Sequence, residues 1–327
     1  MLFIFQRGNV IMQNENNLLS TVHTRYLKGI AILFVLISHI GNYSGKTWFT
    51  PLGGIGVSIF LFCSGFGLMS SYQKNGLSYF WIKKIHTIYI PFIIIETIAA
   101  CFSRSNILDY VLDILLLKTL NPYEWYMQYI VICYLIFFCV CRFCSNKTVR
   151  YCIWVGFSVV SFIFCGNLQG EQCLAFLIGI YVAEHINNFK QCNKRKEREL
   201  GLTLIVVSIL LLLLKQTDFL RQQSHYIVTL LNLIMKSNAM LGIVFVTNSF
   251  RIANKVFSFL GDISYFLYLI HAHLMEIIAQ NLTGKYMMNT LILVILSIGL
   301  SWIFMCFMKK IKEKRKNDDT QGISFKQ

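Results

Sequence analysis

The sequence is poor in charged residues, which make up only 14% of its 327 positions. A soluble globular protein carries about 25% charged residues, so an ordinary soluble fold is excluded. Hydrophobic residues reach 56% and the mean hydropathy is +0.58. The composition therefore predicts an all-α polytopic integral membrane protein whose helices form one bundle rather than several soluble domains.

Acidic residues are especially scarce, because 15 of them stand against 30 lysines and arginines, which gives a formal net charge of +15. An excess of this kind can indicate nucleic-acid binding. Here the cations lie in short segments between apolar runs, which is the topology signal of a membrane protein. We therefore expect the lipid bilayer, and no nucleic acid, as the partner that explains the charge.

The sequence also lacks a metal motif. Its eleven cysteines show no zinc-type pairing, and most lie inside apolar runs. The nearest approach to a motif is the cluster Cys139, Cys141 and Cys144, which we interpret as small buried apolar residues. No repeat period or low-complexity segment is evident, so we expect neither a metal cofactor nor a repeat architecture.

About ten apolar segments predict the transmembrane helices. They cover residues 26–43, 54–72, 83–102, 124–141, 150–165, 171–186, 200–214, 225–248, 262–280 and 287–308. The less apolar stretch 104–123 predicts an interfacial segment. The expected organisation is an N-terminal segment 1–24 (with Met12 as an alternative start), a transmembrane domain 25–308 and a basic tail 309–327.

The cations also predict the orientation. If the N-terminus is cytoplasmic and the loops alternate, the inside loops hold most of the lysines and arginines, including five between residues 187 and 199. The outside set is only Lys46, Arg104, Lys118, Lys215, Arg221 and Lys285. Both termini are therefore expected in the cytoplasm. The remaining cation, Lys236, lies within an apolar segment, and we interpret it as a packing contact or a break in the helix rather than as part of a cavity.

The segment from Arg25 to His39 carries the chemistry. An ionisable group deep in an apolar run is costly, so His39 is a functional-site candidate. Lys28 lies eleven residues, or about three helical turns, before His39, so both share one helix face about 16 Å apart. A cation at the membrane surface and an imidazole below it could bind the two ends of one long molecule.

Several stretches resemble the bacterial membrane acyltransferase-3 family, whose members modify cell-surface glycans. They keep the family's order from residue 25 to about 308. They are Arg25 to His39; Gly54-Ile-Gly56-Val57 through Phe60 to Ser64-Gly65-Phe66; Phe80 through Lys83-Lys84 to Pro91; Glu124-Trp125-Tyr126 through Tyr134; and Ile263-Ser264-Tyr265 through Tyr268 to His271.

Two positions depart from the family pattern. Lys28 stands where the family usually has arginine, and Lys84-x-x-Thr87 stands where it has Arg-x-x-Arg. Lysine keeps the charge but loses the bidentate fork that suits phosphate. The resemblance implies that these segments help to bind the acyl donor. The two departures therefore bear on the affinity for the donor and on the donor's identity.

The resemblance implies an O-acyltransferase of the bacterial inner membrane that uses cytosolic acetyl-CoA or another acyl-CoA. Its acceptor would be a hydroxyl of a surface or lipid-linked glycan, and other glycan-biosynthesis membrane proteins are possible partners. His39 would be the general base, since its ordinary pKa lies near working pH, or else a transient acyl carrier. Arg25, Lys28, Lys83 and Lys84 would bind the donor phosphates.

The remaining candidates are supporting residues. Ser264, Tyr268 and His271 form one helical stripe and predict a hydrogen-bonded seam between helices or a substrate contact. Ser64 lacks the context of a nucleophile and predicts helix packing. Glu96 and Glu124 could orient His39 or the acceptor.

Two other functions stay open: a glycan transporter, although no matching broken helices are evident, and an acyltransferase for a diffusible hydroxylated compound.

Overall fold

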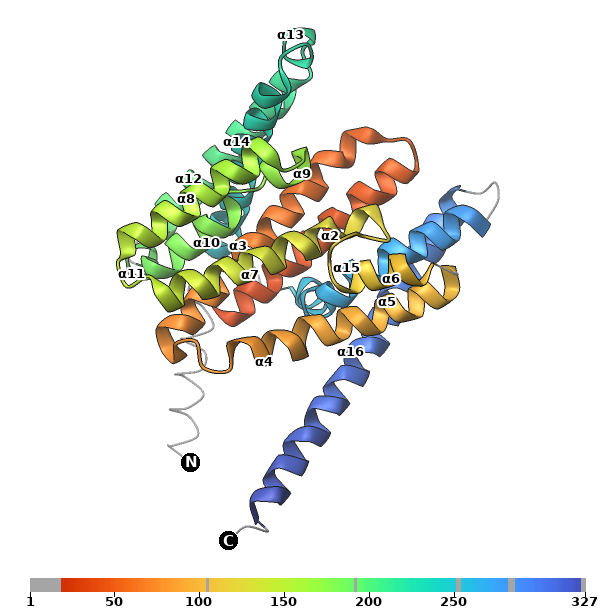
Figure 1. Cartoon of the computed structure of the whole chain (residues 1–327). Coiled ribbons are helices and arrows are strands. Elements are labelled where there is room, and N and C mark those ends of the chain that lie inside the picture. Colours follow the sequence, from red (N-terminus) through yellow and green to blue (C-terminus); the bar gives the residue numbers. More distant parts are fainter. Residues whose placement is uncertain (1–18, 104–105, 191–192, 251–253, 282–285, 325–327) are drawn as a thin grey trace, which may run out of the picture. The chain divides into compact units, whose positions relative to one another are not determined.

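The computed structural model describes residues 19–103, 106–190, 193–250, 254–281 and 286–324, and every regular element in these ranges is a helix (Figure 1). The all-α prediction is therefore confirmed for the described part of the chain. The alternative start at Met12 and most of the predicted N-terminal segment lie outside the described residues.

The chain divides into two compact helical units. The first contains Met1–Ser78 and Tyr129–Asp262, and the second contains Tyr79–Gln128 and Ile263–Gln327. The main helices of the first unit are α2 (Thr21–Tyr43), α3 (Thr50–Asn75), α8 (Lys147–Phe164), α10 (Ala175–Glu184), α12 (Lys194–Lys215) and α14 (His225–Ser249). The second unit contains α4 (Phe80–Lys84), η2 (Ile85–Tyr89), α5 (Ile90–Ser103), α6 (Ile107–Ile114), η3 (Pro122–Glu124) and α16 (Tyr286–Ser324). The helices α7 (Trp125–Phe143) and α15 (Lys255–Asn281) have residues in both units.

Seven described helices are long and apolar enough to cross a membrane, against about ten predicted. Each of the ten predicted segments overlaps a helix, but α10, α12 and α15 are outside the seven. The helix α10 has only ten residues, the first two turns of α12 are highly charged, and α15 contains an aspartate, two histidines and a glutamate. Length and polar content therefore separate these three helices from the rest.

Close helix packing in the first unit depends on small residues. The helix α3 packs along α2 on one side and along α10 on another, and α12 packs along α14. A Cβ atom at Gly65 of α3 would overlap the carbonyl oxygen of Phe176 in α10. The glycine-rich segment therefore lets two helix backbones approach closely, as the sequence predicted.

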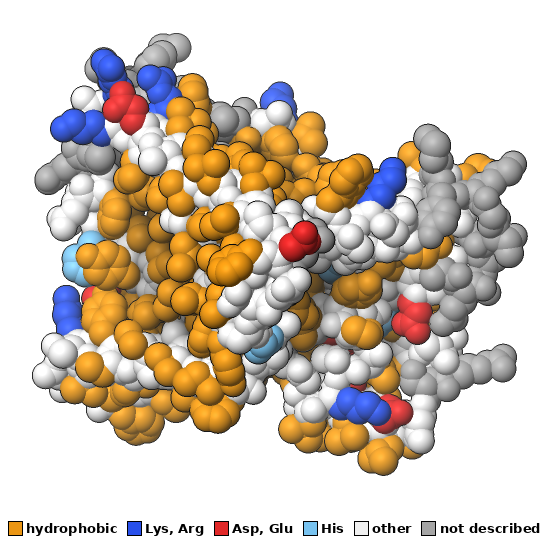
Figure 2. All heavy atoms as spheres, turned by 90° about the horizontal axis from the view of Figure 1, so that it is seen from above, with side chains coloured by type: hydrophobic (Ala, Val, Ile, Leu, Met, Phe, Trp, Pro, Cys, Tyr) orange, Lys and Arg blue, Asp and Glu red, His pale blue; other side chains and the backbone are white. Residues whose placement is uncertain are grey.

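Large apolar side chains are exposed along several helices, and Figure 2 shows hydrophobic side chains over much of the visible face. On α8 they include Val155, Val159, Val160 and Ile163, and on α12 they include Val206, Ile209, Leu210 and Leu213. A monomeric soluble protein rarely exposes contiguous apolar patches of more than a few hundred Å². Lipid is the solvent that suits these faces, in agreement with a multi-pass membrane protein.

Candidate functional site

The helix α2 runs without interruption from Thr21 to Tyr43, so Lys28 and His39 do lie on one continuous helix. It begins at Thr21 because the side chain of Ser20 accepts a hydrogen bond from the backbone N–H of His23. Lys28 and His39 are both half-buried. A separation of eleven residues therefore places them on the same side of α2, about 16 Å apart along its axis.

The guanidinium of Arg25, one turn before Lys28, forms an ion pair with Asp262 of α15 at 3.0 Å. Both side chains are about half exposed. An exposed pair of this kind contributes little to stability, so the Arg25 side chain could exchange Asp262 for a phosphate at small cost. The predicted donor role of Arg25 therefore requires competition with a local carboxylate.

Ser64 lies on α3 in the first unit, and its hydroxyl forms a hydrogen bond with the phenol of the buried Tyr134 in α7. The neighbouring Gly65 lies against the backbone of α10. Both contacts tie α3 to other helices. This arrangement favours the packing interpretation of Ser64 over a nucleophilic role.

Lys83 and Lys84 are the last two residues of α4 in the second unit. Lys83 is exposed, and the chain continues directly into the π-helical turn η2. The hydroxyl of Thr87 donates to the carbonyl oxygen of Lys83 at 2.6 Å. Thr87 thus closes this turn locally, where the family pattern would place a second arginine. Such π-turns are frequent at functional sites.

The stripe on α15 is buried, as all three of its members are enclosed. The hydroxyl of Tyr268 donates to the backbone carbonyl of Tyr123, just before α7. Nδ1 of His271 donates to the carbonyl oxygen of Leu267 at 2.8 Å within α15. At least Tyr268 therefore makes the interhelical hydrogen bond that the stripe predicts.

Glu124 is held at the start of α7 by a capping box. Asn121 accepts from the backbone N–H of Tyr123, and Glu124 reaches back to the N–H of Asn121. The other carboxylate oxygen of Glu124 lies 2.8 Å from Nε2 of His273 on α15. The capping box therefore holds the buried carboxylate of Glu124 against the imidazole of His273.

The same histidine nitrogen also contacts Glu96 of α5, at 3.0 Å. The sequence predicted Glu96 and Glu124 as residues that could orient His39 or the acceptor, and it did not single out His273. The available signal was the general one that an ionisable residue in an apolar segment is a candidate functional residue. His273 meets that criterion as well as His271 does.

Asp113 of α6 is a third buried carboxylate beside Glu96 and Glu124. Burial, and then the charges of Glu96 and Glu124, raise the pKa of Asp113 from its ordinary value to about 8. The backbone N–H of Leu120 donates to Asp113 Oδ1 at 3.2 Å. The segment predicted to be interfacial therefore directs one acidic side chain inward.

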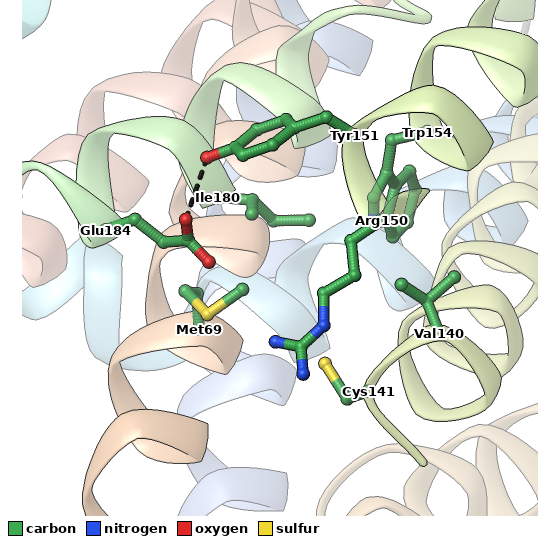
Figure 3. Close-up of a pocket in the computed structure, with 8 residues that line it drawn as sticks. All are labelled: Met69, Val140, Cys141, Arg150, Tyr151, Trp154, Ile180 and Glu184. Atoms are coloured by element: carbon green, nitrogen blue, oxygen red, sulfur yellow. Dashed lines mark hydrogen bonds between the residues drawn. The ribbon is translucent and has the colours of Figure 1, made fainter. Parts of the chain in front are cut away.

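A small pocket of the first unit lies between α3, α7, α8 and α10 (Figure 3). Its polar groups pair locally, since Nε of Arg150 donates to the carbonyl oxygen of Cys144 and the hydroxyl of Tyr151 donates to Glu184. Cys141 lines the pocket. The interpretation of the three cysteines as small buried residues holds for Cys141 alone, because Cys139 is exposed and Cys144 is partly exposed.

Comparison with known proteins identifies the family. Searches of curated proteins and of solved structures gave no match. The family model described as an acyltransferase domain matches residues 25–306, which is most of the chain. Its match begins at Arg25 and includes α2, the glycine-rich α3, the basic turn after α4 and the buried stripe of α15. The protein therefore belongs to the acyltransferase-3 family.

Proposed function

We propose that this membrane acyltransferase moves an acyl group, in the first instance acetyl, from cytosolic acyl-CoA to a hydroxyl of a surface or lipid-linked glycan. The observation that carries the proposal is the family match, which begins at Arg25 and includes the whole Lys28–His39 face of the continuous helix α2. The excess of cations in alternate loops supports a cytoplasmic location for both termini. Arg25 and Lys28 would then face the compartment that contains the donor.

The reaction needs a base, because a sugar hydroxyl is protonated near neutral pH. In the proposed step His39 accepts the hydroxyl proton while the hydroxyl oxygen attacks the thioester carbonyl carbon. A carbon–oxygen bond forms, the carbon–sulfur bond breaks, and the proton is returned to the departing coenzyme A thiolate. Histidine suits both transfers, since its ordinary pKa of about 6.5 lies close to working pH.

The cations of α2 and α4 would bind the donor. Coenzyme A carries several phosphates, and lysine and arginine both bind phosphate as cationic hydrogen-bond donors. With the phosphates at Lys28, the extended pantetheine arm can follow α2 toward His39. Lys83 and Lys84, at the π-helical turn that follows α4, are also proposed as phosphate-binding cations.

Mass spectrometry of the surface glycans of a deletion strain and its parent tests the proposed function. We expect one acyl substituent, with the mass of an acetyl group, to disappear from a glycan in the deletion strain and to return on complementation. If the glycans keep their acyl groups but their amount at the cell surface changes, the result would instead support a role in glycan export. If the deletion strain loses the acyl group only from a secreted small molecule, the acceptor is a diffusible compound and not a glycan.

Changing both Lys83 and Lys84 to alanine should raise the apparent KM for acyl-CoA with little change in kcat. Removing cations that contact only the donor phosphates weakens ground-state and transition-state binding alike. The measurement is the transfer of labelled acetyl groups in isolated membranes at varied donor concentration. Thr87→Arg should act in the opposite direction and lower KM, since it restores the arginine of the family pattern.

Lys74→Ala is the matched control for this experiment, because it removes a cation from the last turn of α3 and not from the π-helical segment. Its KM should equal that of the wild type. If the double variant also keeps the wild-type KM at a normal membrane level, Lys83 and Lys84 determine topology alone.

A further inference from the structure

The second unit contains a buried group of ionisable side chains that the proposed transfer does not use. Glu96, Asp113 and Glu124 are 0%, 1% and 1% exposed, and they come from α5, α6 and η3. His273 of α15 lies against Glu96 and Glu124. We name Glu96, Glu124 and His273 the acid–histidine cluster, with Asp113 as its neighbour.

The charges in this cluster do not balance. Within the cluster, the two carboxylates of Glu96 and Glu124 share one imidazole, which supplies at most one positive charge. The nearby cation Lys118 forms an exposed ion pair with Asp109 at 2.7 Å. No N–H group of the described residues donates to Glu96 Oε2, which is buried, and the Glu96 carboxylate lies against the side chain of Asp113. A buried charge without a partner is costly, so the arrangement favours an additional positive charge.

The geometry suits a metal ion. One ligand atom from each of Glu96, Glu124 and His273 lies within 4.8 Å of the other two. Nε2 of His273 is 3.0 Å from Glu96 Oε1 and 2.8 Å from Glu124 Oε1. Adjacent ligands on an ion with bonds of about 2.0–2.2 Å are about 3.0–3.5 Å apart. Replacing the Nε2 proton by an ion therefore requires only small side-chain movements.

The donor set also selects the type of metal. One imidazole nitrogen with carboxylate oxygens is typical of Zn²⁺, Mn²⁺ or Fe²⁺ sites, whereas Mg²⁺ and Ca²⁺ prefer oxygen ligands alone. The capping box fixes one ligand, because Glu124 is held by the N–H of Asn121.

We propose that Glu96, Glu124 and His273 bind one divalent transition-metal ion, with Asp113 as a further carboxylate beside it. The ion neutralises the buried carboxylates and holds α5, η3 and α15 together in the second unit. This role is separate from acyl transfer at His39, and a failure of one proposal leaves the other intact.

The test measures the metal in the purified full-length protein. The chain is purified in detergent with a tag that lacks histidine, incubated with ZnCl₂ or MnCl₂, separated from free ions and analysed by inductively coupled plasma mass spectrometry. We expect about one ion per chain in the wild type. Loss of one ligand should lower the occupancy at least about tenfold in His273→Gln and in Glu124→Gln. Asp109→Asn, which removes an exposed carboxylate of α6, should keep the wild-type occupancy.

A second measurement does not depend on the variants. Chelation should lower the thermal unfolding midpoint of the wild type, and ZnCl₂ or MnCl₂ should restore it where MgCl₂ does not. Less than about 0.1 ion per chain after incubation, with no shift in the midpoint, would overturn the proposal and show that protons neutralise the cluster. Equal occupancy in the wild type, His273→Gln and Glu124→Gln would also overturn it, because the ion would then lie elsewhere.

Discussion

Replacing His39 with glutamine should lower the rate of acyl transfer by about 10²–10⁴-fold, the usual cost of losing a general base. Glutamine keeps much of the size and hydrogen-bonding capacity of histidine but cannot accept the hydroxyl proton at neutral pH. The variant should reach the membrane at the wild-type level, because His39 is only half-buried near the end of α2. The measurement is the initial rate of labelled acetyl transfer by membranes that contain equal amounts of each protein.

The same helix supplies a matched control in His23. Nδ1 of His23 accepts from the backbone N–H of Leu19, so Nε2 carries the proton that is donated to the hydroxyl of Thr247 at 2.8 Å. These contacts assign His23 a structural role at the start of α2. His23→Gln should therefore reduce the amount of folded protein and leave the rate per folded molecule unchanged.

The two substitutions distinguish a base from a packing residue. If His39 acted only through packing, His39→Gln would be tolerated and His39→Ala would lower the membrane level. Transfer by purified, normally inserted His39→Gln at close to the wild-type rate would contradict the proposed mechanism. A rate lost equally in His39→Gln and His39→Ala at normal protein level supports it.

The helical character of the chain could be predicted from hydropathy, because an apolar segment in lipid must satisfy its own backbone hydrogen bonds. The close approach at Gly65 could also be predicted, since small residues at high density mark helix contacts. The number of spanning helices was less predictable. The charged residues at the start of α12 and the polar residues within α15 lower the hydropathy of helices that otherwise resemble spanning segments.

The acid–histidine cluster shows where prediction from one sequence ends. The Asn-Pro-Tyr-Glu pattern at residues 121–124 is a capping-box signature, so the position of Glu124 at a helix start was predictable. Its contact with His273 was not, because the partners come from positions 96, 124 and 273, and no local spacing relates them. Only the tertiary fold brings these three residues together.

Lys236 is a second case in which the fold supplies the partner. The sequence predicted a packing contact or a break in the helix, and the structure confirms packing, since α14 is continuous from His225 to Ser249. Nζ of Lys236 pairs with Glu171, and Nδ2 of Asn232 donates to the same carboxylate at 2.6 Å. A Cβ atom at Gly54 of α3 would overlap the Lys236 side chain. The glycine-rich segment thus also makes room for a buried cation.

Lys236→Met should destabilise the protein by about 3–5 kcal/mol, because it leaves the carboxylate of Glu171 buried without its cation. The side chains of Lys236 and Glu171 are only 7% and 12% exposed, so water cannot replace the lost partner. We expect the thermal unfolding midpoint in detergent to fall by on the order of 10 °C. Lys118→Met makes the same chemical change in an exposed ion pair, and it should shift the midpoint by only a few degrees.

The double variant Lys236→Met with Glu171→Gln separates charge from packing. Replacing both members of a buried ion pair by neutral groups of similar size is often neutral or stabilising. The introduced glutamine side chain can still accept the hydrogen bond from Asn232, so no charge and few polar atoms are left unpaired. The double variant should therefore recover most of the midpoint lost in Lys236→Met. If both variants unfold at the same lowered temperature, the unpaired charge of Glu171 is not the cause of the loss, and the pairing of Lys236 with Glu171 contributes little to stability.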